Sequence, residues 1–173
     1  MYQQFNKYKI LQEFFNQPNK KFQLREISRL TKISLPSVKK HIQDLVELDL
    51  IKENKEGLYI GYKSSLSTKY KLLKRNDILF LIHHIGLIRE IEDKCTPDCV
   101  VLYGSAVEGT DDERGDVDIF IQSQKKNIDL KNYENKLKRK ISLLFESDLK
   151  KIDDTLKNSF ANGITLSGFL KVI

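Results

Sequence analysis

The chain has 173 residues, with 30 Lys or Arg against 24 Asp or Glu and a formal net charge of +6 at pH 7. This length suits one or two small domains, and an apolar fraction of 40% is enough for real cores. The start lacks the apolar region of a secretory signal, and the most apolar stretch, 78–88, is too short to span a bilayer. These features exclude a secreted or membrane-spanning protein, so we expect a cytoplasmic one.

The positive charge is unevenly distributed along the chain. Residues 1–65 carry 12 Lys or Arg against 7 Asp or Glu, residues 66–98 carry 6 against 5, and residues 99–173 carry 12 against 12. The whole excess therefore lies in the first two thirds of the chain. This distribution suggests that the first part binds a polyanion and that the last part carries chemistry.

The first 65 residues alternate helix and turn signals. Apolar residues at helical spacing predict helices over 8–15, 24–31 and about 35–47, and Ser34 is a good N-cap for the third. Two strand-like runs follow within 50–63 around a turn. We therefore expect a small domain made of two helices, a turn, a third helix and a hairpin.

The string from Glu26 to Ile51 resembles the winged helix-turn-helix of prokaryotic transcription regulators. Asp49 stands where glycine is commonest in that family, and Asp tolerates a left-handed backbone reasonably well. The resemblance implies that the third helix enters the major groove of double-stranded DNA. His41 is expected at the margin of the outward face of this helix.

Five residues are predicted to contact DNA. Ser37 and Gln43 would touch base edges, whereas Lys39 and Lys40 would meet phosphates. Lys55, at the tip of the wing, would reach a neighbouring phosphate. The alternative is a winged domain that mediates protein contacts only, with the lysines as a solvated face.

A single long helix is predicted from Lys69 to about Asp93, capped by Ser67 or Thr68. It would join the two domains, and its apolar face is wide enough to serve as a homodimer surface. His83 and His84 read as packing or rim residues. The Cys-x3-Cys pair that follows lacks the second pair of ligands of a zinc site, so we expect two free thiols.

Residues 100–121 hold the most informative pattern in the chain. An apolar strand is followed by a tight turn at Gly104-Ser105, a short helical turn that ends at Gly109, a charged loop and a second strand. Backbone N–H groups and a serine hydroxyl before a helix start can meet a phosphate.

The second strand places two carboxylates side by side. Its alternation points the apolar side chains of 117, 119 and 121 one way and Asp116 and Asp118 the other way. Adjacent carboxylates repel, and a hard divalent cation such as Mg²⁺ resolves this repulsion, commonly with substrate phosphates as further ligands. The pattern therefore predicts a metal site opposite a phosphate-binding turn.

The whole pattern consists of Gly-Ser, a ten-residue spacer and Asp-x-Asp. It resembles the signature of the DNA polymerase β-type nucleotidyltransferase superfamily, above all that of its minimal members in bacteria and archaea. The resemblance implies a compact mixed sheet and transfer of a nucleoside monophosphate from a triphosphate, with Mg²⁺ or Mn²⁺. Gly104, Ser105 and Gly109 would bind the nucleotide, and Asp116 and Asp118 would hold the metal and act in catalysis.

Active members of this superfamily usually add a third carboxylate on a neighbouring strand. The matching strand is predicted at 141–146, where the expected position reads as Ser142. Glu146 lies on the same strand face and would be the third catalytic carboxylate if the register differs. Two further positions depart from the family pattern: Glu108, where a basic residue is common, and Gly115, where serine is common.

The rest of the chain is predicted to complete this domain. Helices are expected over 133–140 and 149–160, followed by an apolar strand over 164–172. A basic cluster would help to neutralise a triphosphate or would form a solvated helix face. It comprises Lys136, Lys138, Arg139 and Lys140.

The sequence thus predicts an α+β protein with a winged helix-turn-helix at 1–65, a linker helix at 66–98 and a minimal nucleotidyltransferase domain at 99–173. Two functions stay open. The first is an enzyme that transfers a nucleotidyl group, with ATP as the favoured triphosphate, to an acceptor such as a partner protein of a toxin–antitoxin pair. The second is a DNA-binding transcription regulator whose second domain only binds nucleotide or is inactive.

Overall fold

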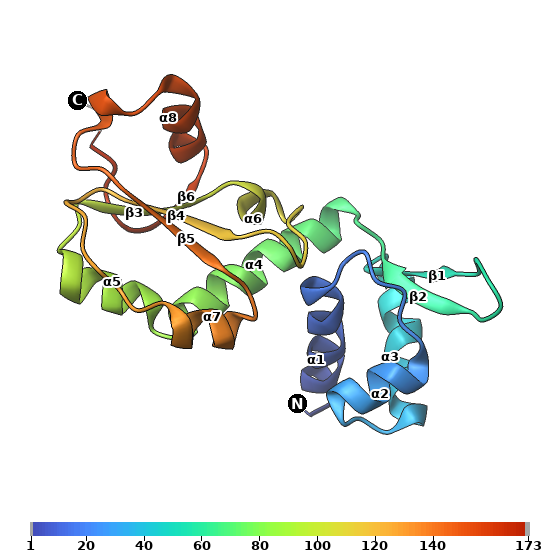
Figure 1. Ribbon diagram of the computed structural model, residues 1–173. Coiled ribbons are helices and arrows are strands. Elements are labelled where there is room, and N and C mark those ends of the chain that lie inside the picture. Colours follow the sequence, from blue (N-terminus) through green and yellow to red (C-terminus); the bar gives the residue numbers. More distant parts are fainter. Residues whose placement is uncertain (1, 172–173) are drawn as a thin grey trace. The chain divides into compact units, whose positions relative to one another are not determined.

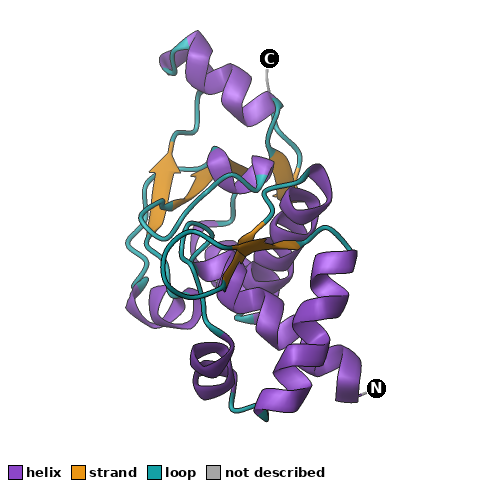
Figure 2. Ribbon diagram, turned by 90° about the vertical axis from the view of Figure 1, so that its right-hand side faces the viewer, coloured by secondary structure: helices purple, strands orange, loops and turns teal. Residues whose placement is uncertain are grey.

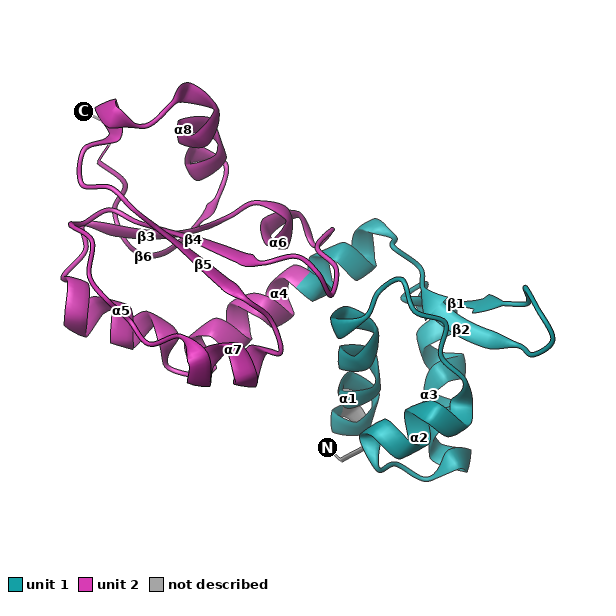
Figure 3. Cartoon of the chain, in the orientation of Figure 1, with its two compact units in different colours: residues 1–74 teal, residues 75–173 magenta. Residues whose placement is uncertain are grey.

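The computed structural model describes residues 2–171, without the side chains of residues 2–4. The chain divides into two compact units, residues 1–74 and 75–173 (Figure 3). Helices account for more of the chain than strands do (Figure 2). Helices and a mixed sheet in the C-terminal unit confirm the predicted α+β class.

The N-terminal unit contains three helices, a hairpin and the start of a fourth helix, α4 (Thr68–His84; Figure 1). The helices pack around a core dominated by aromatic and branched aliphatic side chains. The hairpin strands pair antiparallel, with Ile51 opposite Ser64 and Asn54 opposite Gly61. The elements are α1 (Tyr2–Asn16), α2 (Leu24–Thr31), α3 (Leu35–Glu47), β1 (Ile51–Asn54) and β2 (Gly61–Ser64).

Local backbone geometry follows the sequence signals at two turns of this unit. Asp49 adopts φ 57°, which confirms that Asp occupies the left-handed position after α3. Ser34 stands at the N-cap of α3 with Pro36 just inside the helix, although the Ser34 side chain makes no capping hydrogen bond. Helix α3 therefore begins where the sequence predicts, and the proline contributes to that start.

His41 lies in the core and not at the margin of the outward face. Its side chain is 3% exposed, and neither ring nitrogen has a hydrogen-bond partner within the described residues. Burial lowers the pKa of His41, and Lys7 and Lys40 act in the same direction against the opposing charge of Asp44. The ring therefore packs as an uncharged aromatic group.

The predicted long helix is two helices. Helix α4 (Thr68–His84) ends before Gly86, and α5 (Leu87–Cys95) begins immediately after it. Gly86 has φ 82°, a conformation that stops a right-handed helix and that glycine adopts readily. Apolar spacing continues on both sides of this glycine, which explains why the pattern predicted one helix.

The C-terminal unit is built on a four-stranded mixed sheet with the order β5-β4-β3-β6. Strands β3 and β4 pair antiparallel, β4 and β5 pair parallel, and β6 returns antiparallel to β3. Helices α5 and α7 cover one face of the sheet and α8 covers the other (Figure 1). The strands are β3 (Cys99–Tyr103), β4 (Val117–Ile121), β5 (Ile141–Phe145) and β6 (Ile164–Gly168).

The remaining elements of this unit differ in extent from the expected ones. Helix α7 covers Lys131–Leu137, and the predicted helix over 149–160 is a 3-10 turn, η1 (Leu149–Lys151), followed by α8 (Asp154–Ala161). Asp153 caps α8 by accepting a hydrogen bond from the Leu156 backbone N–H at 3.0 Å. The last predicted strand extends to residue 172, which lies outside the described residues.

The two cysteines are free and buried, as expected from their spacing. Burial raises the pKa of both the Cys95 and the Cys99 thiol, which keeps them protonated near neutral pH. None of the helices in the described part of the chain is both long enough and apolar enough to cross a membrane.

The buried His41 predicts a pH dependence of stability. The pKa in the folded protein lies below the ordinary value of about 6.5 in the unfolded chain, so the unfolded state binds more protons between these two values. The free energy of unfolding should therefore fall as the pH decreases from 7.5 to 5.5. Calorimetric melting temperatures across this range measure it.

Two variants test whether His41 causes this dependence. One replaces its ring by an apolar side chain, and the other replaces an exposed histidine as the control. His41→Leu should flatten the dependence, whereas His83→Leu, at an exposed position of α4, should leave it unchanged. An identical pH slope in wild type and His41→Leu would show that another group is responsible.

Candidate nucleotide and metal site

The turn after β3 is formed by a glycine in an unusual conformation. Gly104 has φ 76° and ψ −158°, a region that is essentially restricted to glycine. The short helix α6 (Ser105–Glu108) starts directly after it, and Gly109 ends the helix with φ 68°. The predicted strand, turn, short helix and closing glycine are thus all present.

Gly104 also lies against one of the two carboxylates. Tyr103 pairs with Asp118 across the β3–β4 ladder, which brings the turn beside the start of β4. A Cβ atom on Gly104 would lie 2.8 Å from Oδ2 of Asp118, closer than a side chain tolerates. The backbone conformation therefore requires glycine at this position, and an added side chain would also make the Asp118 carboxylate shift.

The carboxylate pair shows the expected repulsion. Asp118 points away from the apolar face formed by Val117, Ile119 and Ile121, and Asp116 lies exposed just before the strand. Burial raises the pKa of Asp118, the charge of Asp116 raises it further, and a hydrogen bond with Ser142 opposes the shift. A positive charge next to the two carboxylates would relieve their mutual repulsion.

The residues present fit a hard divalent cation. Two carboxylates next to an open turn supply the oxygen ligands that Mg²⁺ usually takes from a protein, with substrate phosphates as the remainder. No group of three or more His, Cys, Asp or Glu side chains suited to a metal occurs among the described residues. A phosphate or water would supply further oxygen ligands.

The strand register decides which residue stands beside Asp118 on β5. Asp118 pairs with Ser142, and Ile121 at the far end of β4 pairs with Phe145. Glu146 follows Phe145, and its carboxylate accepts a hydrogen bond from the Asp148 backbone N–H at 3.0 Å. The register therefore brings Ser142 into the site and leaves Glu146 at the opposite end of the strand.

A buried ion pair fixes the loop between α6 and β4. Asp111 and Arg139 form a salt bridge in which the two side chains are 4% and 6% exposed. The adjacent Lys140 carbonyl accepts a hydrogen bond from the Val117 N–H at 2.8 Å. Arg139 thus positions the loop that carries Asp116, which sequence reasoning missed by grouping Arg139 with solvated lysines.

Aromatic rings support the same face of the sheet behind the carboxylates. Phe160 of α8 stacks on Phe120 with ring centroids 4.1 Å apart and meets Tyr103 edge-on at 4.9 Å. Burial, and then the charge of Asp118, raise the pKa of Tyr103. The helix α8 is therefore fixed over the sheet close to the Gly104 turn.

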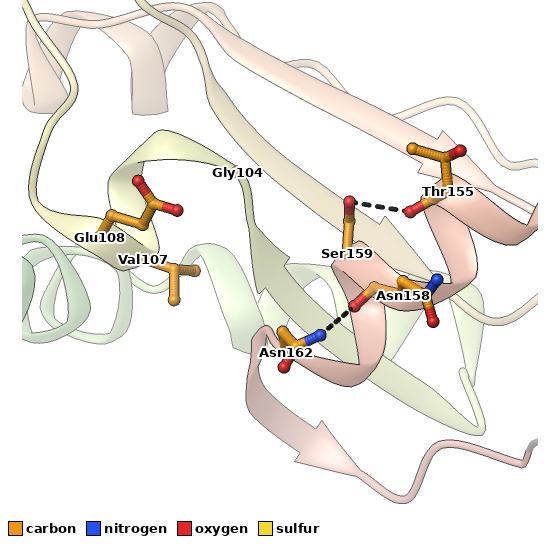
Figure 4. Close-up of a pocket in the computed structure, with 7 residues that line it drawn as sticks. All are labelled: Gly104, Val107, Glu108, Thr155, Asn158, Ser159 and Asn162. Atoms are coloured by element: carbon orange, nitrogen blue, oxygen red, sulfur yellow. Dashed lines mark hydrogen bonds between the residues drawn. The ribbon is translucent and has the colours of Figure 1, made fainter.

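An open pocket of about 610 Å³ lies between α6 and α8 (Figure 4). Its lining combines the turn glycine and the end of α6 with a polar face of α8. Nothing in the sequence pattern indicates this pocket, because polar residues such as those of α8 are common on any exposed helix. The lining residues are Gly104, Val107, Glu108, Thr155, Asn158, Ser159 and Asn162.

In the N-terminal unit, four of the five predicted DNA contacts are exposed. Lys39, Lys40 and Gln43 lie on α3 and Lys55 lies in the hairpin loop, whereas Ser37 is half-buried. The units differ in charge, with 15 Lys or Arg against 7 Asp or Glu in residues 1–74 and 15 against 17 in residues 75–173.

The hairpin loop of this unit also exposes apolar side chains. Leu58 is 87% exposed, and Tyr59 and Ile60 are more than half exposed. Together with Leu24 and Leu35 they line a groove of about 850 Å³ beside the start of α3. Such a groove is the kind of surface that protein contacts use.

The geometry around Gly104 predicts a large and specific effect of one methyl group. Gly104→Ala should lower the free energy of unfolding by more than the roughly 1–3 kcal/mol of backbone strain alone, because the new Cβ also displaces Asp118. Urea denaturation measures the loss.

Gly86→Ala is the matched control in the same unit. Gly86 has φ 82° and ψ 16°, a left-handed conformation that alanine enters at a lower cost than the conformation of Gly104, and no atom lies within 4 Å of the added Cβ. Its loss should therefore be the smaller one, and equal losses in the two variants would contradict the special backbone and the close approach at Gly104.

Comparison with known proteins yields one match. Residues 85–170 match the family model described as Polymerase beta, Nucleotidyltransferase, and the matched region contains the Gly104 turn, both carboxylates and all four strands of the sheet. No curated protein and no solved structure matches the chain. Residues 85–170 are therefore a nucleotidyltransferase domain of the polymerase beta family.

Proposed function

We propose that the C-terminal unit binds the Mg²⁺ complex of a nucleoside triphosphate, with ATP favoured, and transfers its nucleotidyl group to an acceptor hydroxyl with release of pyrophosphate. The close approach of Gly104 to Asp118 carries this proposal, because it joins a phosphate-binding turn to a metal-binding carboxylate in one site. Mn²⁺ would serve as an alternative to Mg²⁺.

Each site residue has a distinct task in this proposal. Asp116 and Asp118 hold the metal, and Gly104 and Ser105 bring backbone N–H groups and a hydroxyl to the triphosphate, while Gly109 ends the helix that fixes the turn. When bound, the metal stabilises the charge that develops on the transferred phosphoryl group. Ser142 stands beside Asp118 across the β4–β5 ladder, where its hydroxyl would help to orient the carboxylate.

A second candidate function is favoured by Ser142 itself. The register places this neutral hydroxyl where the resemblance implies a third carboxylate, and the register leaves Glu146 away from the site. General-base assistance is typically worth about 10²–10⁴ in rate, so its absence favours binding without efficient transfer. The chain would then be a DNA-binding transcription regulator that responds to nucleotide.

The N-terminal unit would supply the DNA contacts in either case. Its charge excess and the exposed Lys39, Lys40 and Gln43 on α3 support a winged helix-turn-helix that binds double-stranded DNA. A partner protein as acceptor, such as the second member of a toxin–antitoxin pair, is a further part of the proposal for the enzyme. The apolar face that the sequence predicts for a homodimer is not free on α4, because Tyr70 and Ile82 are fully buried in the cores, and Phe80, which is 59% exposed, is a remaining candidate contact.

One substitution separates the two candidate functions. Ser142→Asp should raise nucleotidyl transfer by about 10²–10⁴ if the site is a transferase that lacks only its base. The measurement is covalent label on an acceptor after incubation with α-labelled ATP, Mg²⁺ and the protein encoded beside this chain. Asp118→Asn should abolish Mg²⁺-dependent binding of ATP in calorimetric titration.

Ser147→Asp is the control, because it adds the same charge at an exposed serine beyond β5. Tight ATP binding without label in both wild type and Ser142→Asp would favour the regulator. If no triphosphate binds with either Mg²⁺ or Mn²⁺, the metal and nucleotide site itself is wrong.

The DNA proposal predicts a particular salt dependence. Lys39→Ala and Lys40→Ala should each lower affinity for every DNA sequence and reduce the slope of log affinity against log salt by about one. Ser37→Ala or Gln43→Ala should change sequence preference instead. Selection of bound genomic fragments followed by salt titration measures both effects.

Lys136→Ala, an exposed lysine of α7, serves as the control and should leave DNA affinity unchanged. Absent or salt-insensitive DNA binding would instead favour a protein-contact role for the N-terminal unit, through the groove beside Leu58.

A further inference from the structure

The pocket between α6 and α8 shares Gly104 with the metal and phosphate site but has a different chemical character. Seven residues line it, and none of them is Lys or Arg. Glu108 contributes a carboxylate at its α6 side, where the family often has a basic residue. A lining of this kind disfavours a phosphate chain and favours an uncharged ligand with N–H donors.

Two hydrogen bonds determine what the α8 side of the pocket can offer. The Ser159 hydroxyl donates to the Thr155 carbonyl at 3.1 Å, and the Asn162 amide donates to the Asn158 carbonyl at 2.8 Å (Figure 4). The Ser159 hydroxyl and one of the two N–H groups of the Asn162 amide are therefore already engaged within the helix. The carbonyl oxygen of the Asn162 side chain stays available to a ligand.

Two further groups on α8 are unengaged. Within the described part of the chain, neither the Asn158 amide nor the Thr155 hydroxyl makes a side-chain hydrogen bond. With Glu108 and Asn162 they form a set in which acceptor atoms outnumber donors. Glu108 accepts only a weak hydrogen bond, from the Thr110 hydroxyl at 3.3 Å.

We propose that this pocket binds the base of the nucleoside triphosphate and prefers bases with an exocyclic amino group over uracil. Adenine, guanine and cytosine each present N–H donors that the Glu108 carboxylate and the Asn158 and Asn162 amides can accept. Uracil has no amino group and presents a single imino N–H between two carbonyl oxygens, which meet the carboxylate unfavourably. This inference rests on the proposed function, because the triphosphate must lie at Gly104 and Ser105.

The volume of the pocket is compatible with this ligand. Small-molecule sites commonly measure about 300–1,000 Å³, and the pocket has about 610 Å³ beside the turn. The stacked rings of Phe120 and Phe160 hold α8 in place, so its polar face is presented on a rigid element. The base would lie against Val107, the apolar member of the lining.

Calorimetric titration with the Mg²⁺ complexes of ATP, GTP, CTP and UTP tests the proposal, with inorganic tripolyphosphate as the ligand without a base. UTP should bind about tenfold more weakly than the other three nucleotides. Glu108→Gln should reduce this difference. Asn158→Ala should weaken ATP binding by roughly three- to tenfold and leave tripolyphosphate binding unchanged.

Asn135→Ala, at an exposed asparagine of α7, is the matched control and should bind every ligand as wild type does. Equal affinities for all four nucleotides and for tripolyphosphate would overturn the base pocket while leaving the metal and phosphate site intact. If tripolyphosphate and all nucleotides fail to bind, both the base pocket and the proposed function are wrong.

Discussion

The antiparallel pairing of β3 with β4 is the constraint on which the site depends. It places Tyr103 opposite Asp118, so that the residue after Tyr103 must turn away beside a carboxylate. The backbone conformation at that position favours glycine, and a Cβ there would also make the Asp118 carboxylate shift. The Gly104 turn and the start of β4 therefore form one structural unit.

Much of this unit could be predicted from the sequence because its signals are local. The alternation of Val117 to Ile121 fixes which way Asp118 points, and the glycines mark both ends of α6. The position of Ser142 also follows once β4 and β5 pair in parallel. Glu146 would need a shift of the whole ladder, which would change its partners along the entire strand.

The features that sequence reasoning missed depend on contacts between distant segments. Nothing near Arg139 indicates that it lies buried against Asp111, because its neighbours are exposed lysines. The burial of His41 is set by the packing of α3 against the other helices of its unit. At Gly86 the local signal was present, but continuous apolar spacing outweighed it. The spacing of apolar residues thus indicates which face of a helix or strand is buried. The burial of a single polar residue can be seen only in the tertiary structure.

The return of β6 to the sheet has a consequence for how the domain folds. Leu102 of β3 pairs with Ile164, and Cys99 pairs with Gly168. Each pair joins residues that are separated in the sequence by most of the domain. Pairings between residues so far apart in the chain raise the contact order and slow folding. During synthesis β3 and β4 can pair early, whereas the second neighbour of β3 emerges from the ribosome much later. Until then β3 is an open edge strand, and a chaperone or another chain could bind it.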